Sequence, residues 1–352
     1  MADNIKVKNI YYMLAYAFQT LKESGFSSVA GEDFDNIHDL LAAILIHGVG
    51  NQIRRGLYRE YIPQEEALSG LRGRILISES IKQQTLRQRK LVCSFDEFTE
   101  DSPHNQVLKA TMRLLLRFGS VKVENRKQLR KLLLFFGNVT DIAPSAIRWD
   151  TLKYHRNNAA YRMLVNICYL VIKGLLLTTE TGDYRLAKWL SDEQMYRLYE
   201  KFVLAYYQKE HPELNARAAQ IDWDITAGAD RAFLPTMQTD ITLTSGSKTL
   251  IIDTKWYSHT MQTHTLHDST TFISGNLYQI YTYVKNKDRH ATGNVAGTLL
   301  YAKPNEAITP DNDFVIGGNK ISLKTLDLGQ DWSIITRQLE ELLSWLTLEG
   351  AS

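Results

Sequence analysis

Apolar and polar positions follow a helical period through most of the first half of the chain. Helices with one apolar face are predicted over 10–21, 39–55, 81–90 and 106–136. A further segment, 159–177, is apolar nearly all round and is expected to be a buried helix. Its Arg162, Asn166 and Lys173 argue against a membrane span. The front half is therefore predicted to be α-rich.

The pattern changes between residues 57 and 78. Residues 58–62 alternate between polar and apolar, residues 74–77 form a largely apolar run, and proline and glycines punctuate the segment. These features predict a β-hairpin excursion from the helical domain, with Arg72 and Arg74 near its end. Two interpretations stay open: an ordinary surface hairpin, or a projecting finger that binds a partner.

The second half mixes helical and strand periods, which predicts an α/β domain with a mixed central sheet flanked by helices. We expect a helix over 191–210, a helix around Gln279, a closing helix over 332–346, and strands near 217–224, 237–244, 248–257 and 295–302. The polar stretch 178–183 is the predicted linker, which gives domains 1–185 and 186–352.

Two of the predicted strands carry residues that indicate chemistry. Asp240 lies in the first strand, and a Ser-Gly turn leads to an apolar second strand that ends in Asp253-Thr-Lys255. Side chains alternate along a strand, so Asp253 and Lys255 share a face, and pairing through the turn brings Asp240 beside Asp253. Two carboxylates and an ammonium at a sheet edge suit Mg²⁺-dependent phosphodiester hydrolysis. Such a pair is more often a surface ion pair, but a charge that ends a buried strand is costly unless it is used or paired.

The roles expected at this edge follow from the chemistry of a hard cation. Asp240 and Asp253 are the predicted Mg²⁺ ligands, and the backbone carbonyl of Thr254 is the predicted third ligand. Lys255 is expected to position or deprotonate the attacking water.

Two predicted helices add polar residues to these strands. Glu200 lies among apolar neighbours in helix 191–210 and is expected to bind the metal directly or through water. Gln279 and Tyr283 are four residues apart, so they share a face of their helix. They are expected to orient the site or the DNA backbone rather than to perform chemistry.

The order of these elements is a helix with Glu, a strand with Asp, a strand with Asp-x-Lys and a helix with Gln-x-x-x-Tyr. This order resembles the PD-(D/E)xK nuclease superfamily. Thr239 stands where the motif has proline, and Asp253 takes the position of Asp or Glu, so neither feature removes a ligand. The resemblance implies a nuclease fold for the rear domain.

Three further stretches resemble the McrC family, and the resemblance runs from about residue 5 to the C-terminal helix. They are Val7-Lys-Asn-Ile-Tyr-Tyr-Met-Leu-Ala-Tyr-Ala-Phe18, Leu71-Arg-Gly-Arg-Ile75 and Cys93-Ser-Phe-Asp96-Glu-Phe-Thr-Glu-Asp101-Ser-Pro-His-Asn105. Members of this family are nuclease subunits of modification-dependent (5-methylcytosine-type) restriction systems. The resemblance implies a partner, an McrB-like AAA+ GTPase ring that reads modified bases in double-stranded DNA. It also implies stimulation of that GTPase through the N-terminal domain, and it favours the finger, since McrC is thought to insert its N-terminal part into the McrB pore.

Charge is uneven along the chain. The 352 residues carry 41 Lys and Arg against 39 Asp and Glu, but residues 1–190 hold 27 against 19, and residues 191–352 hold 14 against 20. The basic front half suits DNA phosphates or an acidic partner face, and the acidic rear half indicates that something else brings the DNA. No signal peptide or membrane span is predicted, and Cys93 and Cys168 lack metal-site spacing, so a cytoplasmic protein is expected.

Two other functions stay open. The same motifs would serve a stand-alone DNA exonuclease of the RecB-like branch. A non-catalytic adaptor of an AAA+ ring would need no nuclease site, and the intact Asp240, Asp253 and Lys255 argue against it. Nothing in the pattern reads a base, so specificity for a modified base is expected to come from the partner.

Overall fold

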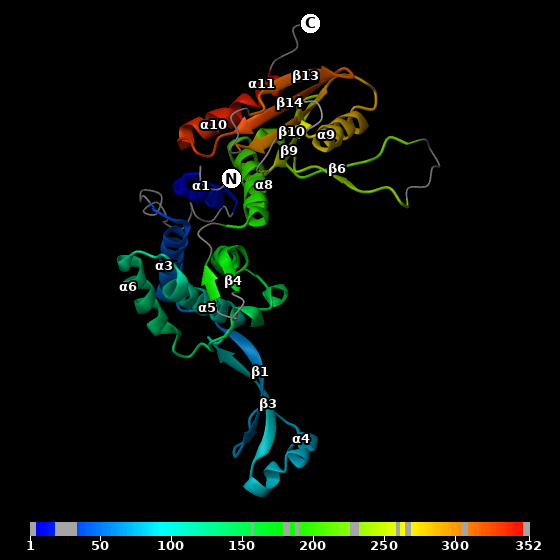
Figure 1. The fold of residues 1–352 in the computed structure, drawn as a ribbon. Helices are drawn as coiled ribbons and strands as arrows, with labels where there is room; N and C mark the ends of the chain where they lie inside the picture. The colour runs from blue at the N-terminus through cyan, green and yellow to red at the C-terminus, as the bar shows by residue number, and fades with distance from the viewer. Residues whose placement is uncertain are drawn as a thin grey trace. The chain divides into compact units, whose positions relative to one another are not determined.

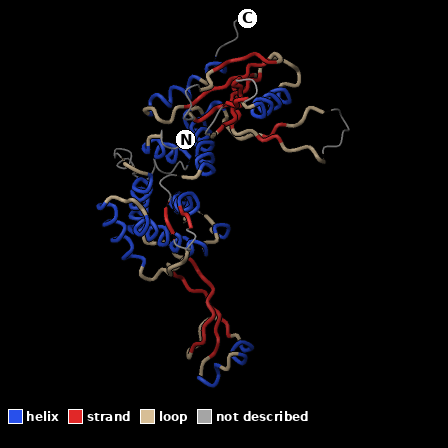
Figure 2. The backbone as a smooth tube through the Cα atoms, viewed as in Figure 1, coloured by secondary structure: helices blue, strands red, loops and turns tan. Residues whose placement is uncertain are grey.

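The computed structural model describes residues 5–17, 34–155, 158–178, 184–186, 190–225, 232–257, 261–264, 269–303 and 309–347. The chain folds as two compact units. One comprises residues 36–188 and is mainly helical, and the other combines residues 1–35 with 189–352 around a sheet (Figure 2). The helical unit is therefore an insertion into the sheet-containing unit.

The inserted unit is mostly helical, as its apolar periodicity predicts. It contains α3 (Ile37–Arg55), α5 (Pro103–Phe118), α6 (Val123–Leu133), α7 (Ala159–Tyr169), the short helices η3 (Leu134–Phe136), η4 (Pro144–Ala146) and η5 (Trp149–Thr151), the π-helical η6 (Leu170–Leu175), and the hairpin of β4 (Leu176–Thr178) and β5 (Tyr184–Leu186). The side chains of Asn36 and Ser102 cap the N-termini of α3 and α5. The single helix predicted over 106–136 breaks at Gly119, where any Cβ would lie 2.6 Å from the carbonyl oxygen of Leu115.

A narrow finger projects from the helices of this unit (Figure 1). It consists of β1 (Glu60–Leu68), β2 (Arg74–Ile75), α4 (Ile77–Lys82), η2 (Thr85–Gln88) and β3 (Leu91–Thr99). β3 is the central strand and pairs antiparallel with β1 over nine residue pairs. The excursion predicted over 57–78 therefore extends to residue 99, and α4 and η2 replace the helix predicted over 81–90. Local periodicity does not reveal the pairing of β1 with β3, because β3 follows the turn after β1 and both short helices, α4 and η2, in the sequence.

The root of the finger is held by Asn105, which is fully buried in the first turn of α5. Its Nδ2 donates hydrogen bonds to the backbone carbonyls of Tyr58, at 2.8 Å, and Glu100, at 2.7 Å. Its Oδ1 accepts a hydrogen bond of 2.9 Å from the hydroxyl of Tyr161. Tyr58 precedes β1 and Glu100 follows β3, so one amide fixes both strands at the root end of the ladder. Asn105 ends one of the three stretches that resemble the McrC family, so that stretch has a structural role at the root of the finger.

The other unit is built on a five-stranded mixed sheet in the order β13-β14-β12-β9-β8. Its strands are β8 (Ile241–Ser245), β9 (Lys248–Lys255), β12 (Val295–Ala302), β13 (Asn312–Ile316) and β14 (Asn319–Leu326). β9, β12 and β14 are parallel, and the edge strands β8 and β13 are antiparallel to their neighbours. The predicted mixed α/β architecture of the rear half is confirmed.

Two details of this sheet differ from the prediction. The hairpin of β13 and β14 was not predicted, although β14 contributes to the core. The strand predicted near 217–224 shrinks to β6 (Gln220–Ile221), which pairs with β7 (Met237–Gln238) outside the main sheet. Beyond β6, side chains replace a strand partner: the backbone N–H of Asp224 donates to Asn286 Oδ1 at 2.7 Å, and Arg289 Nη2 donates to the carbonyl of Asp222 at 3.2 Å.

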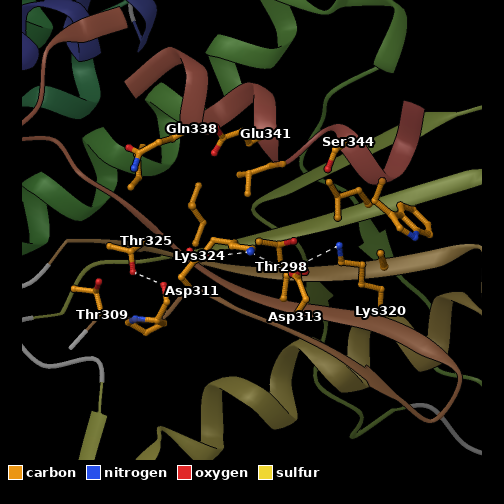
Figure 3. Close-up of a pocket in the computed structure, with 18 of the residues that line it drawn as sticks. Thr298, Thr309, Asp311, Asp313, Lys320, Lys324, Thr325, Gln338, Glu341 and Ser344 are labelled. Carbon is orange, nitrogen blue, oxygen red and sulfur yellow. Dashed lines mark hydrogen bonds and ion pairs between the residues drawn. The ribbon is translucent and has the colours of Figure 1, made fainter. Parts of the chain in front are cut away.

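Helices lie on both faces of this sheet. The remaining elements of the unit are α1 (Val7–Ala17), α8 (Asp192–Glu210), η7 (Pro212–Leu214), β10 (Met261–His264), β11 (Ser269–Phe272), α9 (Ser274–Lys287), α10 (Trp332–Glu341) and α11 (Ser344–Thr347). α9 packs directly onto β12 at Gly297, where a Cβ would lie 2.7 Å from the side chains of Ile280 and Val284. The buried core between α9 and the sheet also includes Ile251 and Leu299. α10 and α11 cover the opposite face (Figure 3).

The first helix, α1, belongs to the sheet-containing unit. Asn9 Nδ2 donates to the carbonyls of Leu328, at 2.7 Å, and Gln330, at 2.8 Å, and the ring of Tyr12 stacks on Trp332 with centroids 4.5 Å apart. The prediction placed this helix in the front domain, because nothing local shows which distant surface its apolar face covers. The second boundary, between residues 188 and 189, lies close to the predicted one.

The difference in net charge between the two structural units is larger than the difference between the two halves of the sequence. Residues 36–188 hold 24 Lys and Arg against 14 Asp and Glu, and the other unit holds 17 against 25. Within the described ranges, every helix is too short or too polar to cross a lipid bilayer.

Candidate active site

Asp240 and Asp253 lie side by side at the end of the β8–β9 ladder. The last pair in register is Ile241↔Ile252, so Asp240 comes directly before the paired end of β8 and Asp253 directly after the paired residue of β9. Asp240 Oδ2 accepts two hydrogen bonds from Thr254, one from its backbone N–H and one from its hydroxyl, both of 2.7 Å. Asp240 also raises the pKa of Asp253, so these two predicted carboxylates lie near each other at this end of the ladder.

Asp253 and Lys255 form a buried ion pair. Their exposed fractions are 2% and 7%, and Lys255 Nζ lies 2.5 Å from Asp253 Oδ2. Burial raises the pKa of Asp253, the Lys255 ammonium opposes this rise, and the Asp240 carboxylate adds to it, so that the pKa is about 6. Among the described residues, no donor makes a well-aligned hydrogen bond to this buried oxygen. The Lys255 ammonium is therefore the group that offsets the charge of this buried oxygen.

Lys255 is also the first member of a polar chain that runs into α9. Its Nζ donates to Gln279 Oε1 at 2.9 Å, and Gln279 Nε2 donates to the hydroxyl of Tyr283 at 3.0 Å. The predicted helix face thus meets the predicted strand. Two residues not singled out from the sequence lie close by: Tyr301 pairs with Lys255 across β12 and β9, and its hydroxyl accepts a hydrogen bond of 3.3 Å from Asn276 Nδ2.

Helix α8 brings Glu200 towards the two aspartates. Burial raises the pKa of Glu200, and the carboxylates of Asp240 and Asp253 raise it further. Tyr196 shares these neighbours: burial raises the pKa of its hydroxyl, and Asp240, Glu200 and Asp253 contribute to the rise. Sequence reasoning missed Tyr196. Its position four residues before Glu200, on the same helix face, was the available signal.

Trp256, the residue after Lys255, fixes α8 against the end of β9. Its Nε1 donates to Asp192 Oδ1 at 3.3 Å, and its ring contacts the ring of Tyr199 with centroids 5.7 Å apart. Asp192 lies in the first turn of α8 and Tyr199 in the third, so these contacts set the helix along the strand end.

The donor set fits a hard divalent cation. Carboxylate and carbonyl oxygens are the ligands that Mg²⁺ prefers, and Asp240 and Asp253 supply two carboxylates at one point. Within the described ranges, no three His, Cys, Asp or Glu side chains gather closely enough to hold a metal ion together. Glu200 is therefore near the two aspartates without joining them in one ligand group. The arrangement suits a cation held by two carboxylates, the predicted Thr254 carbonyl and water.

A separate polar cavity of about 280 Å³ lies on the opposite face of the sheet (Figure 3). Lysines and aspartates of the β13–β14 edge dominate it, and they neutralise one another. Lys324 Nζ lies 2.8 Å from Asp311 and 3.4 Å from Asp313, and Lys320 Nζ lies 3.4 Å from Asp313. The cavity shares none of its lining with Asp240, Asp253 or α9, so it is not part of the carboxylate site.

Arg72 and Arg74 lie in the other unit, on the finger. Arg74 pairs with Ser94 in the β2–β3 ladder, and the Arg72 guanidinium lies 3.9 Å from the centre of the Phe95 ring. Gly73 between them has φ +63°, and a Cβ there would lie 2.4 Å from the carbonyl oxygen of Ser94. The glycine therefore lets both arginines stay exposed at a tight crossing over β3.

Comparison with known proteins identifies the family. Residues 2–302 match the family described as McrBC 5-methylcytosine restriction system component. The chain belongs to this family. It is also 30% identical over 348 residues to the Type IV methyl-directed restriction enzyme EcoKMcrBC of Escherichia coli K12, covering 96% of this chain and 97% of that protein.

A solved structure agrees with the fold. The chain is similar to a chain in a refined half-complex from a tetradecameric assembly of Thermococcus gammatolerans McrB AAA+ hexamers with bound McrC. The TM-score is 0.53 at 17% identity, and the match covers 96% of this chain and 75% of that one. At this identity the likeness concerns the fold alone. This member of the McrBC family thus keeps the family's fold along nearly its whole length.

Proposed function

We propose that this chain is the nuclease subunit of a modification-dependent, 5-methylcytosine-type restriction complex. The observation that carries the proposal is the series of polar contacts from Asp253 through Lys255 to Gln279 and Tyr283, with Asp240 near Asp253 at the same end of two buried strands. Its order along the chain resembles that of PD-(D/E)xK nucleases, which supports this assignment for the sheet-containing unit. A buried charged series of this kind is costly to fold, which supports a functional role.

The site would act on a DNA phosphodiester with Mg²⁺ held by Asp240, Asp253 and the carbonyl of Thr254. When bound, Mg²⁺ lowers the pKa of water and offsets charge on the phosphoryl group. Lys255 holds its amino group beside Asp253. As the ammonium it positions the attacking water, and as the neutral amine it would take the proton of that water. Gln279 accepts a hydrogen bond from that ammonium and so aims it.

Glu200 and Tyr283 are the two remaining predicted site residues, and they would act at the border of the site. Glu200 would reach the cation through water, since among the described residues it forms no group of three metal-binding side chains with the two aspartates. Tyr283 takes no part in the chemical step in this scheme. Its hydroxyl accepts a hydrogen bond from Gln279 Nε2 and fixes the amide in the orientation that presents Oε1 to Lys255.

The inserted unit would engage the partner, an McrB-like AAA+ GTPase ring, and stimulate its GTP hydrolysis. Its finger and net positive charge support this role, as do the exposed Arg72 and Arg74. The sheet-containing unit carries a net negative charge, so it would depend on the ring to deliver double-stranded DNA carrying modified bases.

The test uses the full chain, the partner ring, GTP, Mg²⁺ and methylated DNA. Asp253→Asn and Asp240→Asn keep side-chain shape and should each abolish cleavage while leaving GTPase stimulation intact. Asp311→Asn, in the cavity on the opposite face, is the matched control and should cut normally. Full cleavage by Asp253→Asn would refute the site. Cleavage of DNA ends without ring or GTP would favour the exonuclease alternative, and stimulation without any cleavage by the wild type would favour the adaptor.

A further inference from the structure

Thr254 has an unexpected environment for the middle residue of Asp253-Thr254-Lys255. Its side chain alternates to the face opposite its two neighbours, and the residue is fully buried. Both its backbone N–H and its hydroxyl donate to the same atom, Asp240 Oδ2, at 2.7 Å each. One residue on β9 thus holds, with two donors, one carboxylate oxygen of Asp240, which lies directly before β8.

A second threonine fixes the chain just before Asp240. Thr239 is 1% exposed, its N–H donates to the carbonyl of Ala219 at 2.9 Å, and its hydroxyl oxygen accepts the Ala219 N–H at 3.0 Å. Its hydroxyl also shares a hydrogen bond of 2.9 Å with Thr242. Proline, which has no N–H, could not make the first of these bonds. The departure from the superfamily motif at this position is therefore matched by hydrogen bonds that only a residue such as threonine can form.

These two contacts constrain Asp240 from both ends. Thr239 holds its backbone, and Thr254 holds its carboxylate. Within the described part of the chain, the hydrogen bonds that Asp240 accepts both end on Oδ2. The other oxygen, Oδ1, is thereby turned away from Thr254 in a fixed direction. A carboxylate held in this way loses less side-chain freedom when it binds a ligand.

We propose that Thr254 is a positioning residue: its hydroxyl orients Asp240 so that Oδ1 meets the divalent cation of the site. The inference rests on the proposed nuclease function and adds a residue to it. Thr254 does not touch the substrate in this scheme. Its hydroxyl acts through Asp240, separately from the backbone carbonyl proposed above as a metal ligand, and Thr239 holds the backbone next to the same residue.

The experiment compares Mn²⁺ binding by isothermal calorimetry for the full-length wild type and three variants. Thr254→Val keeps the shape of the side chain and removes the hydroxyl, and its Mn²⁺ Kd should rise about 10- to 100-fold, the usual effect of losing a partner of a metal ligand. Thr254→Ser keeps the hydroxyl and should stay within about threefold of the wild type. Thr298→Val, a buried threonine on the same face of the next strand, should bind Mn²⁺ like the wild type.

A cleavage assay separates positioning from a general structural effect. In Thr254→Val, the metal concentration for half-maximal cleavage should rise while the KM for DNA stays unchanged. A purely structural role would lower thermal stability in Thr254→Val without moving the Mn²⁺ Kd. If Thr254→Val does not fold, Thr254→Ala serves as the second variant and should show the same increase in Kd.

The outcomes distinguish this inference from the proposed function. Equal Mn²⁺ affinity in wild type, Thr254→Val and Thr254→Ala would overturn the role of Thr254 and leave the nuclease site standing. Absence of Mn²⁺ binding by the wild type would overturn the metal site itself, and the positioning role with it. Weaker binding in Thr254→Ser, equal to that in Thr254→Val, would also contradict the inference, because serine retains the hydroxyl.

Discussion

Lys255 holds its ammonium 2.5 Å from the carboxylate of Asp253, two residues earlier on the same strand, and both side chains are almost completely buried. A buried pair of this kind is weak evidence for stability, since removing two charges from water offsets most of their attraction. The pair lies at a strand end, and the same ammonium donates a second contact to Gln279, which supports the catalytic role proposed for Lys255.

Lys255→Met should separate catalysis from metal binding. Methionine matches the length of the lysine chain and removes the ammonium, so DNA cleavage by the full complex should fall at least about 100-fold, in the range of a lost acid–base group. Mn²⁺ binding, measured by calorimetry, should persist because Asp240 and Asp253 remain. Lys285→Met, on the same unit but bonded to Gly317 and Asn319, is the control and should cut normally. Unchanged cleavage by Lys255→Met would remove the lysine from the mechanism.

The inserted unit should act on the partner without the rest of the chain. A fragment spanning 36–188 contains one complete compact unit, so it should fold and stimulate the ring's GTPase without cutting DNA. A fragment spanning 1–185 also carries α1, whose buried Ile10, Met13 and Leu14 would lose their cover and promote aggregation. The measurements are GTPase rate and light scattering. Stimulation that requires residues 189–352 would contradict this division of labour.

Charge reversal on the finger tests the partner surface. Arg72→Glu combined with Arg74→Glu should weaken GTPase stimulation, because both side chains are exposed and basic. The metal site lies in the other unit, so Mn²⁺ affinity should stay unchanged. Lys127→Glu combined with Arg130→Glu reverses the same charge on exposed positions of α6 and is the matched control. If only the α6 pair reduced stimulation, the partner surface would lie on the helices instead.

The lowered pKa of Asp288 predicts a contribution to the free energy of unfolding that is lost in acid. Burial raises the pKa of this carboxyl, but hydrogen bonds from Asn319, Thr292 and Gly293 outweigh it and hold the pKa at about 2. A pKa below the unfolded value of 3.8 stabilises the fold above about pH 4, and this contribution is lost as the pH falls from 4 towards 2.

Asp288→Asn should therefore lower the free energy of unfolding by on the order of 1 kcal/mol at pH 6. The difference from the wild type should narrow as the pH falls from 4 towards 2. Urea unfolding at several pH values measures it, with the exposed Asp150→Asn as control. A difference that stays constant over this pH range would contradict the linkage.

The sequence alone determined the elements and residues whose signals are local. The turn between β8 and β9 is short, so the register that brings Asp240 and Asp253 to the same end of the ladder followed from counting residues. Alternation placed Asp253 and Lys255 on one face, and the four-residue spacing placed Gln279 and Tyr283 together. The ends of α8 and β12 also agree with the prediction, because apolar periodicity marks them without help from distant residues.

The tertiary structure decided what depends on contacts far apart in sequence. The pairing of β1 with β3 across the finger, the addition of β13 and β14 to the sheet, and the packing of α1 against Trp332 all join segments that carry no local sign of their partners. The same holds for Thr254: its place in the sequence marks only a residue between two charged ones. Its hydrogen bonds to Asp240 arise because strand pairing brings a carboxylate 14 residues away within reach of its N–H and hydroxyl. Periodicity encodes which face of an element is apolar, but only packing determines which distant group that face or side chain meets.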